Sequence, residues 1–323
     1  MTIKIATCGW GAPFEEFCAI AAETGYAGIE TNLDEWIDRE NDLRAILKRH
    51  ALEIAACSAG GSFQDPEHRA EDIQRVIETV RRMRDFGIQT LEIHCPARPV
   101  GGPTAEQIKG YADGLNEVGR QCSEMGIKIG IHNHCIQFLE TEAEIDLLYR
   151  YLDPAYVGIG FDTGHLALAG CDPAAVLQRQ IERGFKVAYL HLKDLYQVSQ
   201  PAGDSERVMD FDELLGLATN SDILTWLVIK DMDGRRVVLG GGSLGHRFLE
   251  GHRGLLGGVR CRDITEYQFC EIGQGMIHFA EIFTVLRQSG YDGWAAVELD
   301  VAYRPRSESA AISRQTLKQK FGL

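Results

Sequence analysis

The chain has 323 residues, of which 45% are hydrophobic and 25% are charged, a composition typical of globular proteins rather than disordered or fibrous ones. The 33 basic and 47 acidic residues give a formal net charge of −14, which makes nucleic acid and anionic membranes unfavourable partners. The nine cysteines form no CxxC pair, and no apolar run approaches the roughly 20 residues of a membrane span. We therefore expect a cytoplasmic protein without a signal peptide or a disulfide framework.

Short apolar segments alternate with longer helical patterns along the chain. The predicted strands are Ile3–Cys8, Tyr26–Glu30, Glu53–Cys57, Thr90–His94, Lys128–His132, Val157–Asp162, Val187–His191 and Trp294–Glu298. The predicted helices are Phe14–Ala21, Leu43–His50, Pro66–Phe86, Ala105–Met125, Glu142–Tyr151, Pro173–Arg183 and Phe279–Gln288. This alternation predicts an α/β fold with eight parallel strands, which form either a closed barrel or an open, doubly wound sheet.

Polar residues at the carboxyl ends of the strands favour the barrel. Such residues lie at the ends of the second, fourth, fifth, sixth, seventh and eighth strands: Glu30, Glu92 with His94, His132 with His134, Asp162, His191 and Glu298. A barrel brings these strand ends together at one mouth, whereas an open sheet spreads them along an edge. No GxGxxG motif follows the first strand, which further disfavours a dinucleotide-binding sheet. We therefore predict a (β/α)8 TIM barrel.

One segment interrupts the regular spacing of the strands. The fifth, sixth and seventh strands begin about 30 residues apart, but the seventh and eighth begin at residues 187 and 294. The intervening segment contains a predicted β-hairpin, Trp226–Lys230 and Arg235–Leu239, with an Asp-Gly turn, followed by a glycine-rich stretch. We expect a barrel formed by residues 1–200 and 271–323, with residues 201–270 as an inserted lid or partner-binding subdomain. A surface excursion without a chemical role is the alternative.

Four of the strand-end residues have the chemistry of metal ligands. His132, Asp162, His191 and Glu298 each end an apolar strand, and burying such groups without a partner would be costly. Two imidazoles and two carboxylates suit a divalent cation such as Mn²⁺, Co²⁺, Zn²⁺ or Fe²⁺. We therefore predict one metal site at the barrel mouth.

The motifs at these strand ends resemble those of the xylose isomerase-like barrel superfamily, whose members include sugar epimerases, inosose dehydratases and endonuclease IV. The motifs are Asp162-Thr-Gly-His165, His191-Leu-Lys-Asp194, Gly273-Gln-Gly-Met-Ile-His-Phe279 and Glu298. The resemblance implies one divalent metal, usually Mn²⁺, and Mg²⁺ is a further option for this chain. Asp162, His191 and Glu298 match three ligands of the ketose epimerases. His132 stands where those enzymes have a glutamate that also moves a proton, and the run from His132 to His134 is more similar to the inosose dehydratase group.

The resemblance also implies roles for residues near the metal. His165 matches a histidine that faces the substrate. His134 follows His132 by two residues and points the same way on an extended strand, so it could be a base, a substrate ligand or a support. Lys193 could stabilise negative charge on a substrate oxygen. Asp194 is expected to bind substrate, to orient a ligand or to pair with Lys193.

Earlier strands should supply contacts to the substrate. The resemblance implies that Glu30 and His94 contact sugar hydroxyls, although a rim salt bridge is equally open for Glu30. Trp10 follows the first strand, and its ring would pack against a sugar face. On the loop after the fifth strand, Glu140 is expected to be a solvated residue near a helix N-terminus.

These features predict a divalent-metal-dependent lyase. Such an enzyme would remove the proton beside the carbonyl of a keto sugar or keto cyclitol and expel a β-leaving group, as inosose dehydratases or C-glycoside deglycosidases do. A sugar isomerase or epimerase is the first alternative and a sugar-binding barrel without catalysis is another. The acidic charge disfavours an enzyme like endonuclease IV. The expected partners are a sugar or glycoside and a second copy of the chain, with a small β-rich subunit as a further option.

Overall fold

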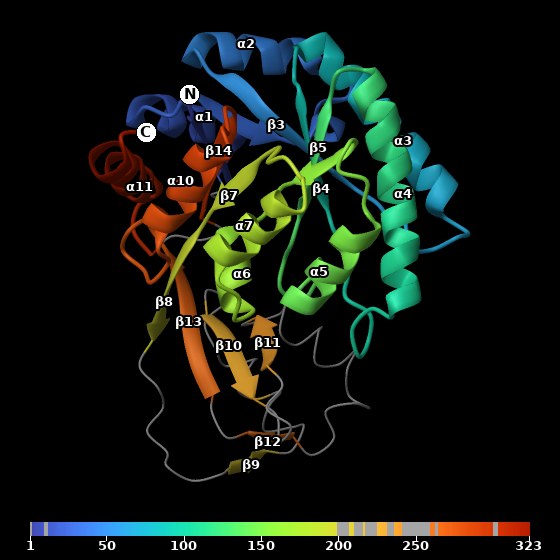
Figure 1. The fold of residues 1–323 in the computed structure, drawn as a ribbon. Coiled ribbons are helices and arrows are strands. Elements are labelled where there is room, and N and C mark those ends of the chain that lie inside the picture. Colours follow the sequence, from blue (N-terminus) through green and yellow to red (C-terminus); the bar gives the residue numbers. More distant parts are fainter. Residues whose placement is uncertain are drawn as a thin grey trace.

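The computed structural model describes residues 2–9, 12–198, 207–209, 216, 225–230, 236–240, 259–261, 264–299 and 303–323. Eight parallel strands form the central sheet (Figure 1): β1 Lys4–Gly9, β2 Gly28–Thr31, β3 Glu53–Gly60, β4 Thr90–His94, β5 Lys128–His132, β6 Val157–Ile159, β7 Leu190–Leu192 and β14 Trp294–Leu299. The helices around it are α1 Phe14–Thr24, α2 Glu40–His50, α3 Arg69–Phe86, α4 Ala105–Glu124, α5 Glu142–Tyr151, α6 Thr163–Leu168, α7 Pro173–Glu182, α10 Phe279–Gln288 and α11 Arg306–Phe321, with a 3-10 turn η1 at Leu33–Trp36.

The sheet closes into a barrel. Its strands lie in the order β6-β5-β4-β3-β2-β1-β14-β7, and every neighbouring pair is parallel. Parallel bridges from Ile159 to Val187 and from Asp162 to His191 join the two ends of this order. The predicted (β/α)8 barrel is therefore confirmed.

The helices follow the sequence pattern because their apolar residues recur on one face. In α3, the apolar residues Val76, Ile77, Val80 and Met83 are buried in the hydrophobic core. This helix ends at Gly87, whose φ of 71° is a left-handed conformation that glycine adopts at low cost. The long final helix α11 was not predicted, because its sequence has almost no apolar periodicity; it packs against α1.

Two glycines bring β5 and the end of β6 close together. A Cβ atom on Gly160 would lie 2.7 Å from the carbonyl carbon of Gly130, so a larger residue would force these segments apart. The same two segments continue into His132 and Asp162. The glycines therefore allow these two side chains to be neighbours at the barrel mouth.

The inserted segment forms a separate antiparallel sheet, which extends from one end of the barrel (Figure 1). Its strands are β11 Arg236–Gly240, β10 Thr225–Lys230, β13 Ile264–Cys270 and β8 Asp194–Val198, in that spatial order. The predicted hairpin pairing is present in β10 and β11, while its Asp-Gly turn lies outside the described residues. The sheet begins at Asp194, two residues after the end of β7 and before the predicted boundary at residue 201. A short pair, β9 Arg207–Met209 and β12 Val259–Cys261, also forms within the insertion.

Hydrophobic side chains attach the inserted sheet to the barrel. Trp226, Val228 and Val238 pack with Leu168 of α6 and Cys135 of the loop after β5. The eight cysteines with described side chains are free and buried. Within the described parts of the chain, no helix has both the length and the hydropathy that a membrane crossing requires.

Candidate active site

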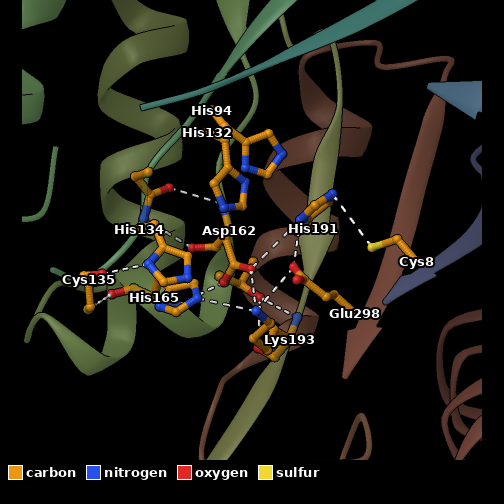
Figure 2. Close-up of polar contacts among 12 residues, drawn as sticks. Cys8, His94, His132, His134, Cys135, Asp162, His165, His191, Lys193 and Glu298 are labelled. Atoms are coloured by element: carbon orange, nitrogen blue, oxygen red, sulfur yellow. Dashed lines mark hydrogen bonds and ion pairs between the residues drawn. The ribbon is translucent and has the colours of Figure 1, made fainter. Parts of the chain in front are cut away.

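The carboxyl ends of the barrel strands bring most of the predicted site residues together (Figure 2). The residues that meet there are His94 from β4, His132 from β5, Asp162 after β6, His191 from β7, Lys193 after β7 and Glu298 from β14. Trp10, predicted to contact the substrate, lies outside the described residues. Asp162 is also the N-cap of α6, because its Oδ1 accepts a hydrogen bond from the His165 amide at 2.8 Å. This cap leaves Oδ2 of Asp162 available to the barrel mouth.

Three of the four predicted metal ligands form one buried cluster. Single ligand atoms of Asp162, His191 and Glu298 all lie within 4.8 Å of one another. His191 Nδ1 is 2.7 Å from Glu298 Oε2 and 3.9 Å from Asp162 Oδ2. None of these three buried atoms has a partner with hydrogen-bond geometry within the described structure. One nitrogen and two carboxylate oxygens that converge without hydrogen bonds fit a divalent cation.

Two further carboxylates orient the other side of the His191 ring. His191 Nε2 lies 2.7 Å from Glu30 Oε2 and 3.1 Å from Glu92 Oε2. Carboxylates in this position fix the ring of a metal-binding histidine and strengthen its free nitrogen as a ligand. Glu30 was predicted to contact a sugar, but the structure places its side chain, 7% exposed, behind His191. Burial and the nearby Glu92 raise the pKa of Glu30.

Glu92 is a central residue of the site, which the sequence analysis placed at a strand end without giving it a role. Its carboxylate is fully buried and contacts three imidazoles: His132 Nδ1 at 3.2 Å, His94 Nε2 at 3.1 Å and His191 Nε2 at 3.1 Å. Burial opposes ionisation, but His191 and His132 outweigh it and hold the pKa of Glu92 well below its usual value. The alternation Glu92-Ile93-His94 at a strand end was the available signal.

His132, the fourth predicted metal ligand, belongs to this neighbouring group. Its ligand atom clusters with those of Glu92 and His191 rather than with Asp162 and Glu298. Its ring stacks on His94, with centroids 4.5 Å apart, and lies 4.8 Å from the ring of His191. Burial lowers the pKa of His132 to about 4, so the ring is neutral at neutral pH. Metal binding by His132 therefore stays a prediction.

His134 and His165 form a second pair of imidazoles. Their ring centroids are 3.5 Å apart. His134 Nδ1 lies 2.5 Å from the carbonyl oxygen of Cys135, and His165 Nε2 lies 3.2 Å from Lys193 Nζ. The remaining nitrogen of His165, Nδ1, is buried without a partner among the described residues. Burial lowers the pKa of His134 to about 3 and that of His165 well below its usual value, so both rings are neutral.

Lys193 connects the two groups of side chains. It is fully buried, and its Nζ lies 3.1 Å from Glu298 Oε2 and 3.4 Å from Asp162 Oδ2. The methylene chain of Lys193 crosses the backbone at Gly164, where a Cβ atom would lie 2.8 Å from Lys193 Cγ. The glycine of the Asp-Thr-Gly-His motif therefore makes room for the lysine.

Asp194 holds a loop instead of facing the site. Its carboxylate accepts hydrogen bonds from four backbone amides at 2.9 to 3.1 Å: Leu195, Gly273, Gly275 and Ile277. A Cβ atom on Gly275 would lie within 2.3 Å of Asp194 Oδ1, which explains the glycine in this motif. Asp194 therefore holds the segment 273–277, and its contact with substrate stays a prediction.

The inserted sheet contributes two aromatic side chains next to the histidine pair. The ring of Trp226 lies 5.5 Å from His165 and 6.1 Å from His134, in both cases edge to face. Phe269 lies 5.2 Å from His165, and Lys193 Nζ is 4.8 Å from its ring centroid. The sequence analysis missed both residues, because no local sequence pattern predicts that β13 pairs with β8 and β10.

The comparisons with known proteins define the class of this chain. A family model described as "Xylose isomerase-like TIM barrel" matches residues 18–320, so the chain belongs to that family. Among curated relatives, the inosose dehydratase of Bacillus anthracis is 28% identical over 328 residues and covers 96% of this chain and 90% of its own. Inosose dehydratase 2 of Bacillus cereus is 25% identical over 324 residues, with the same coverage. Relatives with these names identify the chain as an enzyme.

Solved structures share the fold at lower sequence identity. The probable 3-DHS dehydratase AsbF of Bacillus anthracis has a TM-score of 0.63 and 14% identity, covering 98% of this chain and all of its own. The IolI protein, solved with a bound zinc atom, has a TM-score of 0.63 and 16% identity, covering 98% of this chain and 97% of its own. An L-ribulose 3-epimerase gives a TM-score of 0.63 at 15% identity, covering 98% of this chain and 93% of its own.

Proposed function

We propose that this protein is a divalent-metal-dependent dehydratase that removes water from a keto cyclitol of the inosose type. The observation that carries the proposal is the convergence of three ligand atoms that lack hydrogen-bond geometry, on Asp162, His191 and Glu298, close to Lys193. The same lysine contacts His165, whose ring lies 3.5 Å from that of His134. The curated relatives named inosose dehydratase, aligned over nearly the whole chain, support the substrate class.

Asp162, His191 and Glu298 would hold the metal, with His132 as the proposed fourth ligand. A bound divalent cation polarises a substrate carbonyl and makes the adjacent C–H bond more acidic. The mixed nitrogen and oxygen donors accept Mn²⁺, Co²⁺, Zn²⁺, Fe²⁺ or Mg²⁺. We favour Mn²⁺ because the sequence resemblance implies it.

The hydrogen bonds of the two histidines assign their protons. The carbonyl oxygen of Cys135 can only accept, so His134 Nδ1 must donate to it. A neutral His134 ring therefore has its lone pair on Nε2. The ammonium of Lys193 can only donate, so His165 Nε2 accepts from it and the proton of the neutral ring lies on Nδ1. The pair thus offers one proton acceptor and one proton donor.

This arrangement provides both proton transfers of an elimination. His134 Nε2 takes the proton from the carbon beside the carbonyl, and the C–H electron pair forms a carbon–carbon double bond. The C–O bond to the β-hydroxyl breaks, and His165 Nδ1 supplies the proton that completes a water molecule while His165 Nε2 takes a proton from the Lys193 ammonium, so the ring stays neutral. Lys193 stabilises negative charge that develops on the substrate oxygen. The substrate loses one water molecule, and no oxidant or reductant is needed.

Epimerisation is the competing reaction for this site. Inversion at one carbon usually needs an acid and a base on opposite faces of the substrate. The ring centroids of His134 and His165 are only 3.5 Å apart, so the two rings act from one side of the substrate, which favours elimination. The deglycosidase-like reaction, the homo-oligomer and the small β-rich subunit stay predictions.

A substrate panel tests the proposal. The metal-loaded protein is incubated with inososes, 3-oxo-glycosides and free ketoses, and the products are identified by NMR. We expect an unsaturated product from an inosose, formed equally well by His68→Gln, a control on the exposed surface of the chain. Interconversion of epimeric ketoses without elimination would contradict the proposal, as would the absence of turnover across the panel.

A further inference from the structure

The loop that follows β5 contains a residue in an unfavourable backbone conformation. Ile136 has a φ of 60°, in the left-handed region. Asp38 and Ala51 share this feature among the described residues, but Ile136 alone of the three is β-branched. A branched side chain crowds the backbone in this conformation, which persists only where the surroundings impose it. Such residues are concentrated at functional sites.

A buried carboxylate holds Ile136 in place. The amide of Ile136 donates a hydrogen bond to Glu140 Oε2 at 2.5 Å, and its carbonyl accepts one from the Arg98 amide at 3.4 Å. Glu140 was expected to be solvated, but its residue exposure is 6%. Its own amide donates to Glu144 Oε2, and Glu144 pairs with Arg98 at 2.7 Å. Glu140 is therefore held by hydrogen bonds at its carboxylate and at its backbone amide.

The peptide group that Glu140 contacts also contacts His134. The N–H of this group belongs to Ile136 and the C=O belongs to Cys135. Glu140 accepts from the N–H, and His134 Nδ1 donates to the C=O at 2.5 Å. Because the N–H and C=O of a trans peptide point in opposite directions within its plane, Glu140 and the His134 ring lie at opposite edges of one rigid, planar group. Rotation of that plane would release the ring.

We propose that Glu140 is a positioning residue, which acts through the Cys135–Ile136 peptide group to fix the orientation and the Nδ1–H tautomer of His134. The inference rests on the proposed function of His134 as the proton acceptor. It assigns a role to the unfavourable conformation of Ile136, because that conformation directs the Cys135 carbonyl towards the ring.

Substitutions at residue 140 test the role through kinetics. Glu140→Ala removes the acceptor, and we expect kcat to fall about 10-fold to 100-fold while KM changes less than about twofold. Glu140→Gln keeps an oxygen that can accept from the Ile136 amide, so it should retain most of the activity. Glu140→Asp keeps the charge but is one methylene shorter, so it should show the same loss as alanine and serves where the alanine variant fails to fold. Wild-type kcat in a folded alanine or aspartate variant would overturn the proposal.

A second substitution separates positioning from general damage. Glycine adopts a positive φ at low cost, so Ile136→Gly in the Glu140→Ala background should recover part of the lost kcat. Ala51→Gly is the matched control, because Ala51 has a φ of 53° at the end of α2, outside the site. This control should not restore activity. Equal recovery by both glycine substitutions would contradict the positioning role.

A spectroscopic measurement keeps the test independent of the substrate. Imidazole ¹⁵N spectra should show His134 as a single Nδ1–H tautomer in the wild-type protein and as a mixture in the Glu140→Ala variant. An unchanged His134 signal in that variant would overturn the inference. Failure of the wild-type protein to dehydrate any inosose would refute the proposed function alone, because the tautomer measurement needs no turnover.

Discussion

His191 lies between four carboxylates, two on each side of its ring. Nδ1 faces Asp162 and Glu298, whereas Nε2 faces Glu30 and Glu92. Burial lowers the pKa of His191, but the surrounding acidic groups, with Cys8 among them, raise it well above its usual value. The carboxylates at the two edges of the ring differ in their other contacts. Glu92 also contacts His132 and His94, whereas Glu298 also contacts Lys193. At the Nδ1 edge, His191 Nδ1, Asp162 Oδ2 and Glu298 Oε2 have no hydrogen-bond partner among the described residues.

Metal binding should depend on the two sides of His191 to different degrees. Glu298→Gln removes a direct ligand, and we expect little divalent metal to remain after dialysis. Glu30→Gln removes only the support of the ring and should weaken metal affinity about 10-fold to 100-fold. Metal content is measured by mass spectrometry and affinity by chelator competition. Glu281→Gln, on the exposed side of α10, is the control; wild-type metal affinity in Glu298→Gln would contradict the assignment.

The residues predicted from sequence were those that end apolar strands, because a barrel necessarily brings such positions together. Asp162, His191 and Glu298 belong to this class. Glu92 was placed at a strand end but given no role, because its importance comes from three histidines on other strands, and the register that aligns them is not local information. Glu140 was misjudged because an acidic residue before a helix is normally solvated, whereas here it is buried and accepts a hydrogen bond from the Ile136 amide.

At the level of elements, α5 shows how a single carboxylate secures the segment after β5. Thr141 and Glu144 form a capping box at its N-terminus. Glu144 also forms a bidentate pair with Arg98, at 2.7 and 3.0 Å, with both side chains largely buried. This ion pair joins the loop after β4 to α5, the helix that follows the loop containing His134. The prediction of α5 from its apolar spacing was confirmed, but no local pattern indicated the ion pair.

The stability contributed by Glu144 should depend on pH. Burial raises its pKa, but the guanidinium of Arg98 outweighs burial and the net pKa is lowered. The contribution is therefore complete above the unfolded pKa of about 4.3 and is lost as the pH falls through the lower folded pKa. Glu144→Gln should cost about 2 kcal/mol of unfolding free energy at pH 7.

Urea unfolding at several pH values measures this dependence. The difference between wild type and Glu144→Gln should narrow below about pH 4.3. Glu106→Gln, at an exposed position in the first turn of α4, should differ little from wild type at any pH. A constant difference between pH 7 and pH 3 would show that the charge of Glu144 is not what stabilises the fold.

On the scale of the whole molecule, the barrel supplies the polar site and the inserted sheet supplies its aromatic side. Trp226 reaches His134 and His165 from β10, and Arg236 of β11 donates to the carbonyl of Leu168 at 2.8 Å. The sequence predicted the barrel because each βα unit has its own pattern. It predicted only the hairpin of the insertion, because the remaining strands pair with partners far away in the chain.

Removal of residues 203–263 tests whether the insertion is a lid. We expect the shortened chain to fold cooperatively and to bind metal, because β7 and β14 remain in the barrel. Thermal stability should fall, since Leu168 and Phe269 lose apolar contacts, and turnover should fall much further. Loss of cooperative unfolding would place the segment in the core of the fold, whereas undiminished turnover would contradict a lid.

Trp226→Leu, which keeps the apolar contact but removes the indole, should show a smaller loss of turnover than the deletion.

The most direct test of the proposed chemistry is hydrogen exchange in D₂O. The metal-loaded wild-type protein should convert an inosose to an unsaturated product and exchange one hydrogen beside the carbonyl, both followed by NMR. His134→Gln should retain its metal and lose both the exchange and the product, because the lone pair on Nε2 is gone. Exchange at the wild-type rate in His134→Gln, or an epimeric ketose as the sole product of the wild-type protein, would contradict the account.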